Sequence, residues 1–103
     1  MVLTSIVFRA RPHKRSELLS AVDATMERLR TIPACERCRL LVDSEDPNAF
    51  TLASEWQSAS DAEAFLGSRD FQIFKGVRIL LKDEPVVVID DIASRVTRLV
   101  RGH

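Results

Sequence analysis

The sequence predicts an α+β domain of the ferredoxin-like class, a four-stranded antiparallel sheet with helices on one face. Two observations carry this prediction. The apolar residues change their spacing along the chain in the order strand, helix, strand, strand, helix, strand, which is the split βαβ pattern. The 103 residues contain no internal repeat, low-complexity segment or linker, so the pattern describes one domain. We place this domain in residues 1–92 and a basic C-terminal tail in residues 93–103.

The first strand is expected within residues 2–10, VLTSIVFRA, which are rich in β-branched and aromatic residues and lack Gly and Pro. Alternation divides this strand into two faces. One face carries Ile6, Phe8 and Ala10, and the other carries Ser5, Val7 and Arg9. A helix is expected next, over residues 13–31, after Pro12 and before Pro33. Its apolar residues recur at helical spacing: Leu18, Leu19, Val22, Met26 and Leu29.

Two short apolar runs, residues 38–43 and 49–56, bracket the polar segment SEDPN. Such a segment between two strands predicts an antiparallel hairpin. The second run alternates, so one face is expected to carry Phe50, Leu52, Ser54 and Trp56. Thr51, Ala53 and Glu55 belong to the other face.

The next segment predicts two helices and a last strand. Ser60 followed by Glu63 is a capping-box pattern, so a short helix is expected over residues 61–67, ended by Gly67. Ser68 can cap a second helix, in which Phe71, Phe74, Val77 and Leu81 recur at helical spacing, joined by Ile73 and Leu80. Pro85 begins the last strand, PVVVIDD. In the tail, Val96 and Val100 would share a helix face, but Val96, Arg98 and Val100 also alternate as in a strand.

The charge balance argues against several classes of partner. Fifteen basic and 15 acidic residues cancel, so no long-range field attracts nucleic acid or an anionic membrane. No apolar run reaches the ~18 to 20 residues of a membrane span. The N-terminal apolar run lacks the features of a signal peptide, and a cytoplasmic location is expected. The C-terminal cluster of Arg95, Arg98, Arg101 and His103 is interpreted as solvated, with a phosphate or partner contact as the alternative.

Two Cys residues in the segment PACERCR raise the question of redox or metal chemistry. Zinc sites need four ligands, and the only His residues, His13 and His103, lie at the two ends of the chain. The sequence therefore does not indicate a zinc site at the two Cys residues. A redox pair normally opens a helix, whereas this one leads into a strand in which Cys35 and Cys38 are expected on opposite faces. We interpret both as packing residues and expect no metal.

The sheet face opposite the helices carries apolar residues, including Val7, Ala53 and half of the run VVVI. An apolar sheet face without a cover predicts a homodimer.

Three segments together resemble the antibiotic biosynthesis monooxygenase family. The first is DPNAFTLASEW, residues 46–56, a loop and a strand that ends in Glu-Trp. About eight residues later follows a Leu-x-Ser-x-x-Phe pattern, here residues 66–71. The third, IPACERCRLLVD, is similar to the family's Pro-Gly-Cys turn into a strand, with Ala34 where Gly is usual. The resemblance covers roughly residues 1–92.

The resemblance implies a ferredoxin-like homodimer, a dimeric α+β barrel, whose two sheets pack face to face. Some members of the family oxygenate polycyclic phenols or quinols without metal or flavin, others degrade haem, and many have no known substrate. Of the family's catalytic residues only Trp56 matches. A His that many members have nine positions after the Trp is Phe65 here, and the axial His of the haem-degrading branch is Lys75. Residues 2–10 also lack the first-strand Asn of that branch, so haem degradation is not expected. The polyketide-oxidising branch uses Tyr residues near the Trp, and this chain has none. We expect no cofactor.

We therefore expect Trp56 as the catalytic residue of an apolar pocket, and we weigh each candidate against a plain structural role. The expected pocket residues are Phe8, Phe50, Leu52, Ser54, Phe65, Phe71, Phe74 and Arg78. Arg9 and His13 are further polar candidates, and Arg9 and Arg78 also suit structural ion pairs. One hypothesis is a cofactor-independent monooxygenase that oxidises a small aromatic or quinol-like molecule with O2. The alternative is a non-catalytic dimeric module that binds a small apolar ligand or a protein partner.

Overall fold

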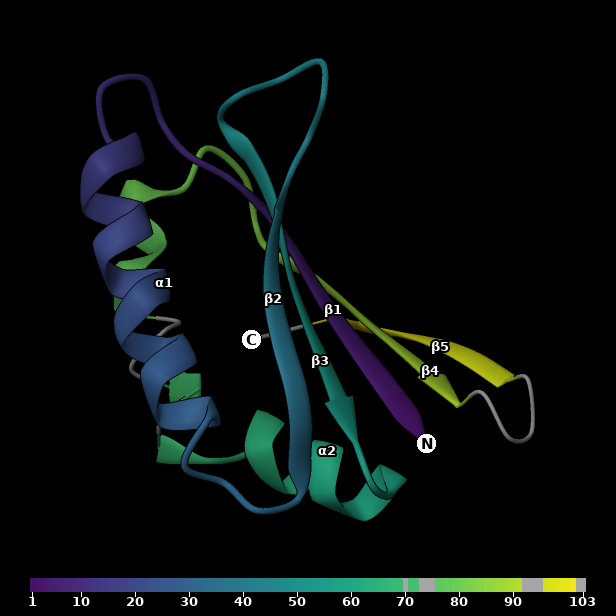
Figure 1. Ribbon diagram of the computed structural model, residues 1–103. Helices are drawn as coiled ribbons and strands as arrows, with labels where there is room; N and C mark the ends of the chain where they lie inside the picture. Colours follow the sequence, from purple (N-terminus) through teal and green to yellow (C-terminus); the bar gives the residue numbers. More distant parts are fainter. Residues whose placement is uncertain (70, 73–75, 92–95, 102–103) are drawn as a thin grey trace.

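The computed structural model describes residues 1–69, 71–72, 76–91 and 96–101. The elements in chain order are β1 (Val2–Arg9), α1 (Arg15–Leu29), β2 (Cys35–Val42), β3 (Ala49–Trp56), α2 (Ala59–Leu66), η1 (Gly76–Leu80), β4 (Val86–Asp91) and β5 (Val96–Arg101). The strands form one sheet in the order β2-β3-β1-β4-β5, and every neighbouring pair is antiparallel. Figure 1 shows α1 and α2 on the same side of the sheet.

The first four strands have the predicted ferredoxin-like arrangement, in which β1 lies between β3 and β4. The fifth strand comes from the tail. Residues 96–101 pair with β4, Val96 opposite Asp91 and Arg101 opposite Val86, so the strand alternative for this segment is confirmed. The boundary between a domain in residues 1–92 and a tail in residues 93–103 stays a prediction.

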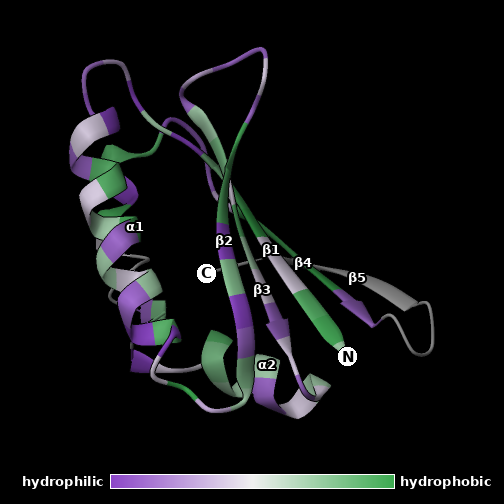
Figure 2. Cartoon of the chain, in the orientation of Figure 1, coloured by the Kyte–Doolittle hydropathy of each residue, from purple (hydrophilic) through white to green (hydrophobic). Residues whose placement is uncertain are grey.

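The central strands alternate as predicted, with one face in the core. Ile6 on β1 lies opposite Leu52 on β3 and Val87 on β4, and all three side chains are at most 1% exposed. The helix α1 covers this face, because its buried residues recur at helical spacing: Leu18, Val22, Thr25, Met26 and Leu29. Figure 2 shows hydrophobic and hydrophilic residues side by side along α1, as a helix with one packed face requires.

The cap of α2 differs from the prediction. The helix begins at Ala59, and its N-cap is Ser58, whose Oγ accepts a hydrogen bond of 3.2 Å from the backbone N–H of Asp61. Ser58 has the extended backbone that an N-cap needs, with φ −146° and ψ 162°. The reciprocal pair is therefore Ser58 with Asp61, and not Ser60 with Glu63. Gly67 ends the helix as predicted.

The predicted second helix is also different. Ser68 does cap a helical turn, since its Oγ accepts a hydrogen bond of 3.3 Å from the N–H of Phe71. Farther on, the chain forms a 3-10 helix at Gly76–Leu80. Backbone hydrogen bonds join the end of this 3-10 helix to the end of β1. Arg11 N–H donates to Leu80 O at 2.9 Å, and Lys82 N–H donates to Arg9 O at 2.8 Å. These bonds draw Leu81 into a bridge with Ala10 and out of helical geometry.

The strand β2 begins at Cys35, earlier than the predicted residue 38, and contains a bulge between Cys35 and Arg37. The bulge changes which face each thiol occupies. Cys35 pairs with Trp56 and Cys38 pairs with Ser54, and both Cys side chains pack against the core. The prediction that they lie on opposite faces is wrong, because an extra residue in a strand shifts the alternation by one.

Within the described ranges of the chain, no helix combines the length and the apolar character that crossing a membrane requires.

Candidate ligand site at Trp56

The last residue of β3, Trp56, is held inside the domain by two neighbouring strands. It pairs with Val2 on β1 and with Cys35 on β2, and only 1% of its surface is exposed. Its indole Nε1–H donates a hydrogen bond of 3.2 Å to the hydroxyl of Thr4, which is fully buried. A buried indole N–H needs such an acceptor, so this bond orients the ring.

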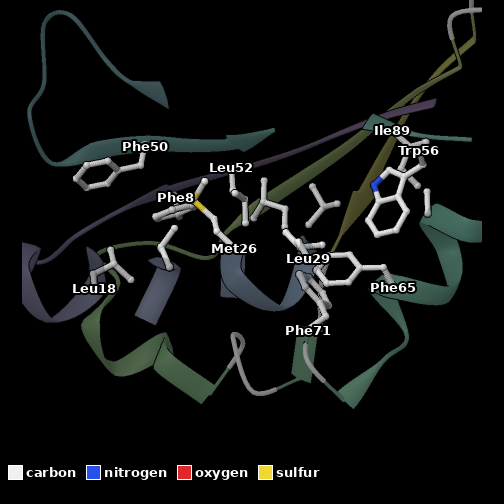
Figure 3. Packing of buried hydrophobic residues seen from close by; sticks show 14 of the residues in the cluster. Phe8, Leu18, Met26, Leu29, Phe50, Leu52, Trp56, Phe65, Phe71 and Ile89 are labelled. Carbon is white, nitrogen blue, oxygen red and sulfur yellow. The ribbon is translucent and has the colours of Figure 1, made fainter. Parts of the chain in front are cut away.

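Two further aromatic rings continue from the indole toward the helices. Phe65, on α2, stacks on Trp56 with ring centroids 5.3 Å apart and an interplanar angle of 27°. Phe71 packs against Phe65 at 5.6 Å with an angle of 59°. Figure 3 shows the three side chains together at one end of the core, near Leu29 and Ile89. The ring pairs fix the position of α2 over the end of the sheet.

A surface depression of about 210 Å³ borders this cluster. Its lining comes from the turn before β2, from the end of β3, from α2 and from the segment just after α2: Ile32, Ala34, Trp56, Asp61, Ala64, Phe65 and Ser68. Because the indole has almost no exposed surface, it closes the inner end of the depression and does not stand free in it.

Two polar side chains in the lining already have protein partners. The carboxylate of Asp61 accepts a hydrogen bond of 2.7 Å from the Ser58 hydroxyl. The Ser68 hydroxyl donates a hydrogen bond of 2.6 Å to Phe65 O. The depression therefore offers an apolar recess with one carboxylate at its edge, a surface suited to a flat apolar molecule.

Of the predicted pocket residues, Trp56 and Phe65 line the depression, and Phe71 lies behind Phe65. Three others are core residues near α1. Phe8 and Phe50 stack with centroids 5.7 Å apart, Leu52 is fully buried, and the Arg15 guanidinium lies 5.3 Å from the Phe50 ring centroid. A pocket role for these three stays a prediction.

The remaining candidates are spread over the molecule. Arg78, in η1, forms an ion pair with Glu84, and Arg9 donates a 2.8 Å hydrogen bond to Asp83, so both have the expected structural partners. His13 is exposed, with a positive φ of 66°. Phe74 and Lys75 lie outside the described residues.

Ser54 is fully enclosed, with 1% of its surface exposed, and its hydroxyl has no hydrogen-bond partner among the described residues. It lies directly opposite Thr4 in the sheet, two residues before Trp56 on the same face of β3.

Sequence reasoning missed several residues of the site. Thr4 occupies an inward position of β1, in register with Ile6 and Phe8, so alternation could have flagged it as a buried hydroxyl. Ile32 and Ala34 belong to a turn, where their apolar character was the available signal. Asp61 could have been found only with the correct cap residue.

The described part of the chain holds no group of three or more His, Cys, Asp or Glu side chains that could bind a metal ion. Both Cys residues are free thiols. Burial and the nearby Cys38 raise the pKa of the Cys35 thiol, which also donates a weak hydrogen bond of 3.6 Å to Arg37 O. At neutral pH Cys35 is therefore a protonated, weakly reactive thiol.

The opposite face of the sheet has a hollow of its own, of about 200 Å³. It is lined by Leu3, Arg37, Arg39, Leu41, Ala53 and Glu55. Val7 and Val86, also on this face, are 40% and 43% exposed. In this chain the face combines apolar side chains with charges of both signs.

Solved structures with the same fold include several proteins of low sequence identity. A crystal structure of an antibiotic biosynthesis monooxygenase is 21% identical with a TM-score of 0.80, and the match covers 88% of this chain and 97% of that chain. Rv0793 from Mycobacterium tuberculosis is 22% identical with a TM-score of 0.79, covering 87% and 92%. PA3566 from Pseudomonas aeruginosa is 22% identical with a TM-score of 0.73, covering 96% and 94%. These likenesses establish the fold.

A comparison with curated proteins finds no match. The family model described as antibiotic biosynthesis monooxygenase matches residues 1–76, which include β1 to α2 and the whole described lining of the depression. The chain belongs to the antibiotic biosynthesis monooxygenase family.

Proposed function

We propose that the protein binds a small aromatic or quinol-like molecule in the depression at Trp56 and oxidises it with O2 without a cofactor. The observation that carries this proposal is the apolar recess closed by the stacked rings of Trp56 and Phe65. Membership of the family supports the reaction class. In such a reaction the electrons come from the substrate itself, as a phenolate or hydroquinone anion, and the protein supplies a dry pocket and a proton acceptor.

Asp61 is the candidate proton acceptor, because it is the one carboxylate in the described lining. Its hydrogen bond from Ser58 holds the carboxylate at the edge of the recess, where a substrate hydroxyl could reach the second oxygen. The Trp56 indole N–H is a donor only and is engaged by Thr4, so it cannot take a proton.

The test is O2 uptake during aerobic incubation with a panel of hydroquinones and anthrones. We expect uptake above the rate without protein, and a loss of that excess in Asp61→Asn. Asp23→Asn, at an exposed position of α1, is the matched control and should retain the excess. Uptake in Asp61→Asn equal to that of the wild type would remove Asp61 from the mechanism.

The alternative function is a non-catalytic module that binds the same class of ligand. Two hydrogen bonds favour it: Asp61 accepts one from the Ser58 hydroxyl, and the Ser68 hydroxyl donates one to Phe65 O. These bonds leave few polar groups of the lining free for chemistry. Saturable ligand binding without O2 uptake over the whole panel would favour this function.

We also propose that the protein is a homodimer joined through the sheet face opposite the helices. The support is the mixture on that face of exposed apolar residues, such as Val7 and Leu41, with Arg37, Arg39 and Glu55. A two-fold interface can bring a basic group of one copy to an acidic group of the other. Light scattering should give twice the mass of the 11.6 kDa chain at micromolar concentration, and the monomer mass would contradict the proposal.

A further inference from the structure

The hydroxyl of Ser54 is an exception in the core. It is buried, and it has no hydrogen-bond partner among the described residues, whereas the other buried hydroxyls, of Thr4 and Thr25, have one each. A buried hydroxyl without a partner destabilises a folded protein, because it has lost its hydrogen bonds to water. The position of this hydroxyl therefore calls for an explanation other than stability.

That position is next to the indole. Ser54 and Trp56 lie on the same face of β3, and Ser54 is the direct cross-strand partner of Thr4, which accepts the indole hydrogen bond. The indole thus extends from the wall of the depression, where it contacts Phe65, to the Thr4–Ser54 pair. Figure 3 shows its nitrogen on the side of the ring turned toward the Leu52 part of the core. A molecule that shifts the indole away from Thr4 would open the depression onto Ser54.

We propose that Ser54 is the specificity-determining residue of the site, and that its hydroxyl binds one hydroxyl or carbonyl oxygen of an aromatic ligand that packs against the Trp56 indole and shifts it away from Thr4. This inference rests on the proposed function. A serine hydroxyl both donates and accepts, so it can bind a phenol O–H as well as a carbonyl oxygen. Thr4 holds the indole in place when no ligand is bound.

The size of the depression limits the ligand. Its volume of about 210 Å³ is below the ~300 to 1,000 Å³ of pockets for drug-sized ligands, so the ligand should have only one or two rings. The surrounding lining is mostly apolar, and its polar groups Asp61 and Ser68 are engaged. An aromatic ligand that directs one oxygen at Ser54 and has its other polar group at the Asp61 edge matches this distribution of polar groups.

The test compares p-cresol with p-xylene, which differ by a hydroxyl in place of a methyl group. Trp56 is the only Trp of the chain, so an NMR spectrum of the 15N-labelled protein contains one indole N–H peak, and its shift reports binding at the site. We expect the wild type to bind p-cresol roughly tenfold more tightly than p-xylene, the change that corresponds to one hydrogen bond.

Two variants separate Ser54 from buried hydroxyls in general. Ser54→Ala should lose the preference for p-cresol, with p-xylene affinity unchanged and with a denaturation midpoint equal to or above that of the wild type. Thr25→Val removes a buried hydroxyl that has a partner, Ala21 O at 3.0 Å, and should keep the preference for p-cresol. A preference that survives in Ser54→Ala, or equal binding of the two probes by the wild type, overturns this inference alone. An indole peak that neither probe shifts overturns the proposed function as well.

Discussion

The indole N–H of Trp56 and the hydroxyl of Thr4, 52 residues apart in the sequence, form a buried hydrogen bond of 3.2 Å. This bond connects the last residue of β3 to the inward face of β1 and so fixes the ring that closes the depression. Since each partner is enclosed by the core, neither group can exchange the other for water.

Thr4→Val should therefore destabilise the protein by about 1 to 2 kcal/mol, because the shape is kept while the buried indole N–H loses its acceptor. The indole proton resonance should move upfield. Thr4→Ser retains the acceptor and should retain the downfield resonance even if its stability falls through the lost methyl group. An unchanged resonance in Thr4→Val would show that the bond does not form in solution.

Trp56→Phe should lower the free energy of unfolding by about 2 kcal/mol or more, because an enclosed ring is replaced by a smaller one and leaves a void. A urea melt measures the loss. The same variant should lose most ligand affinity, since the wall of the depression is removed. A stability loss with unchanged ligand affinity would make Trp56 a core residue only.

Ser58→Ala should cost about 1 kcal/mol, because the N-cap acceptor of α2 is lost. Ser60→Ala, at the second residue of α2, should change stability by a few tenths of a kcal/mol at most. If Ser60→Ala lowered the stability more than Ser58→Ala, Ser60 would be the N-cap of α2.

Cys35 gives a pH-dependent contribution to stability with a defined sign. Because burial and Cys38 raise the pKa of its thiol, the folded state keeps the proton longer than the unfolded state. The contribution is fully present below the unfolded thiol pKa of roughly 8.5. It is lost as the pH rises through the folded pKa. The difference in unfolding free energy between the wild type and Cys35→Ala should be constant from about pH 6 to 8 and should then fall. If the difference in unfolding free energy between the wild type and Cys35→Ala did not change up to about pH 10.5, the pKa of the Cys35 thiol would not be raised in the folded protein.

The sequence predicted the parts of the fold that depend on hydrophobic periodicity. The inward faces of β1 and β3 follow from alternation, and the packed face of α1 follows from the helical spacing of Leu18, Val22, Met26 and Leu29. The family resemblance located Trp56 and Phe65, which do line one depression.

Other features depend on geometry that periodicity does not encode. The bulge after Cys35 changes the face of Cys35 relative to the rest of β2, and no residue type in CERC requires a bulge. Ser58 and Ser60 both have an acidic residue three positions later, so only the backbone conformation distinguishes the cap. The depression brings together a turn, a strand end and α2, and the unpartnered hydroxyl of Ser54 becomes apparent only when its neighbours are placed.

Whether the depression at Trp56 binds a small aromatic molecule is tested most directly by a titration of the indole N–H peak with a panel of hydroquinones under nitrogen. We expect at least one compound to shift this peak saturably. Trp56→Phe has no indole, so its binding of that compound is followed on the NMR signals of the ligand, and we expect that binding to be lost. An indole peak that no compound of the panel shifts, in a protein that remains folded, would contradict binding at the depression.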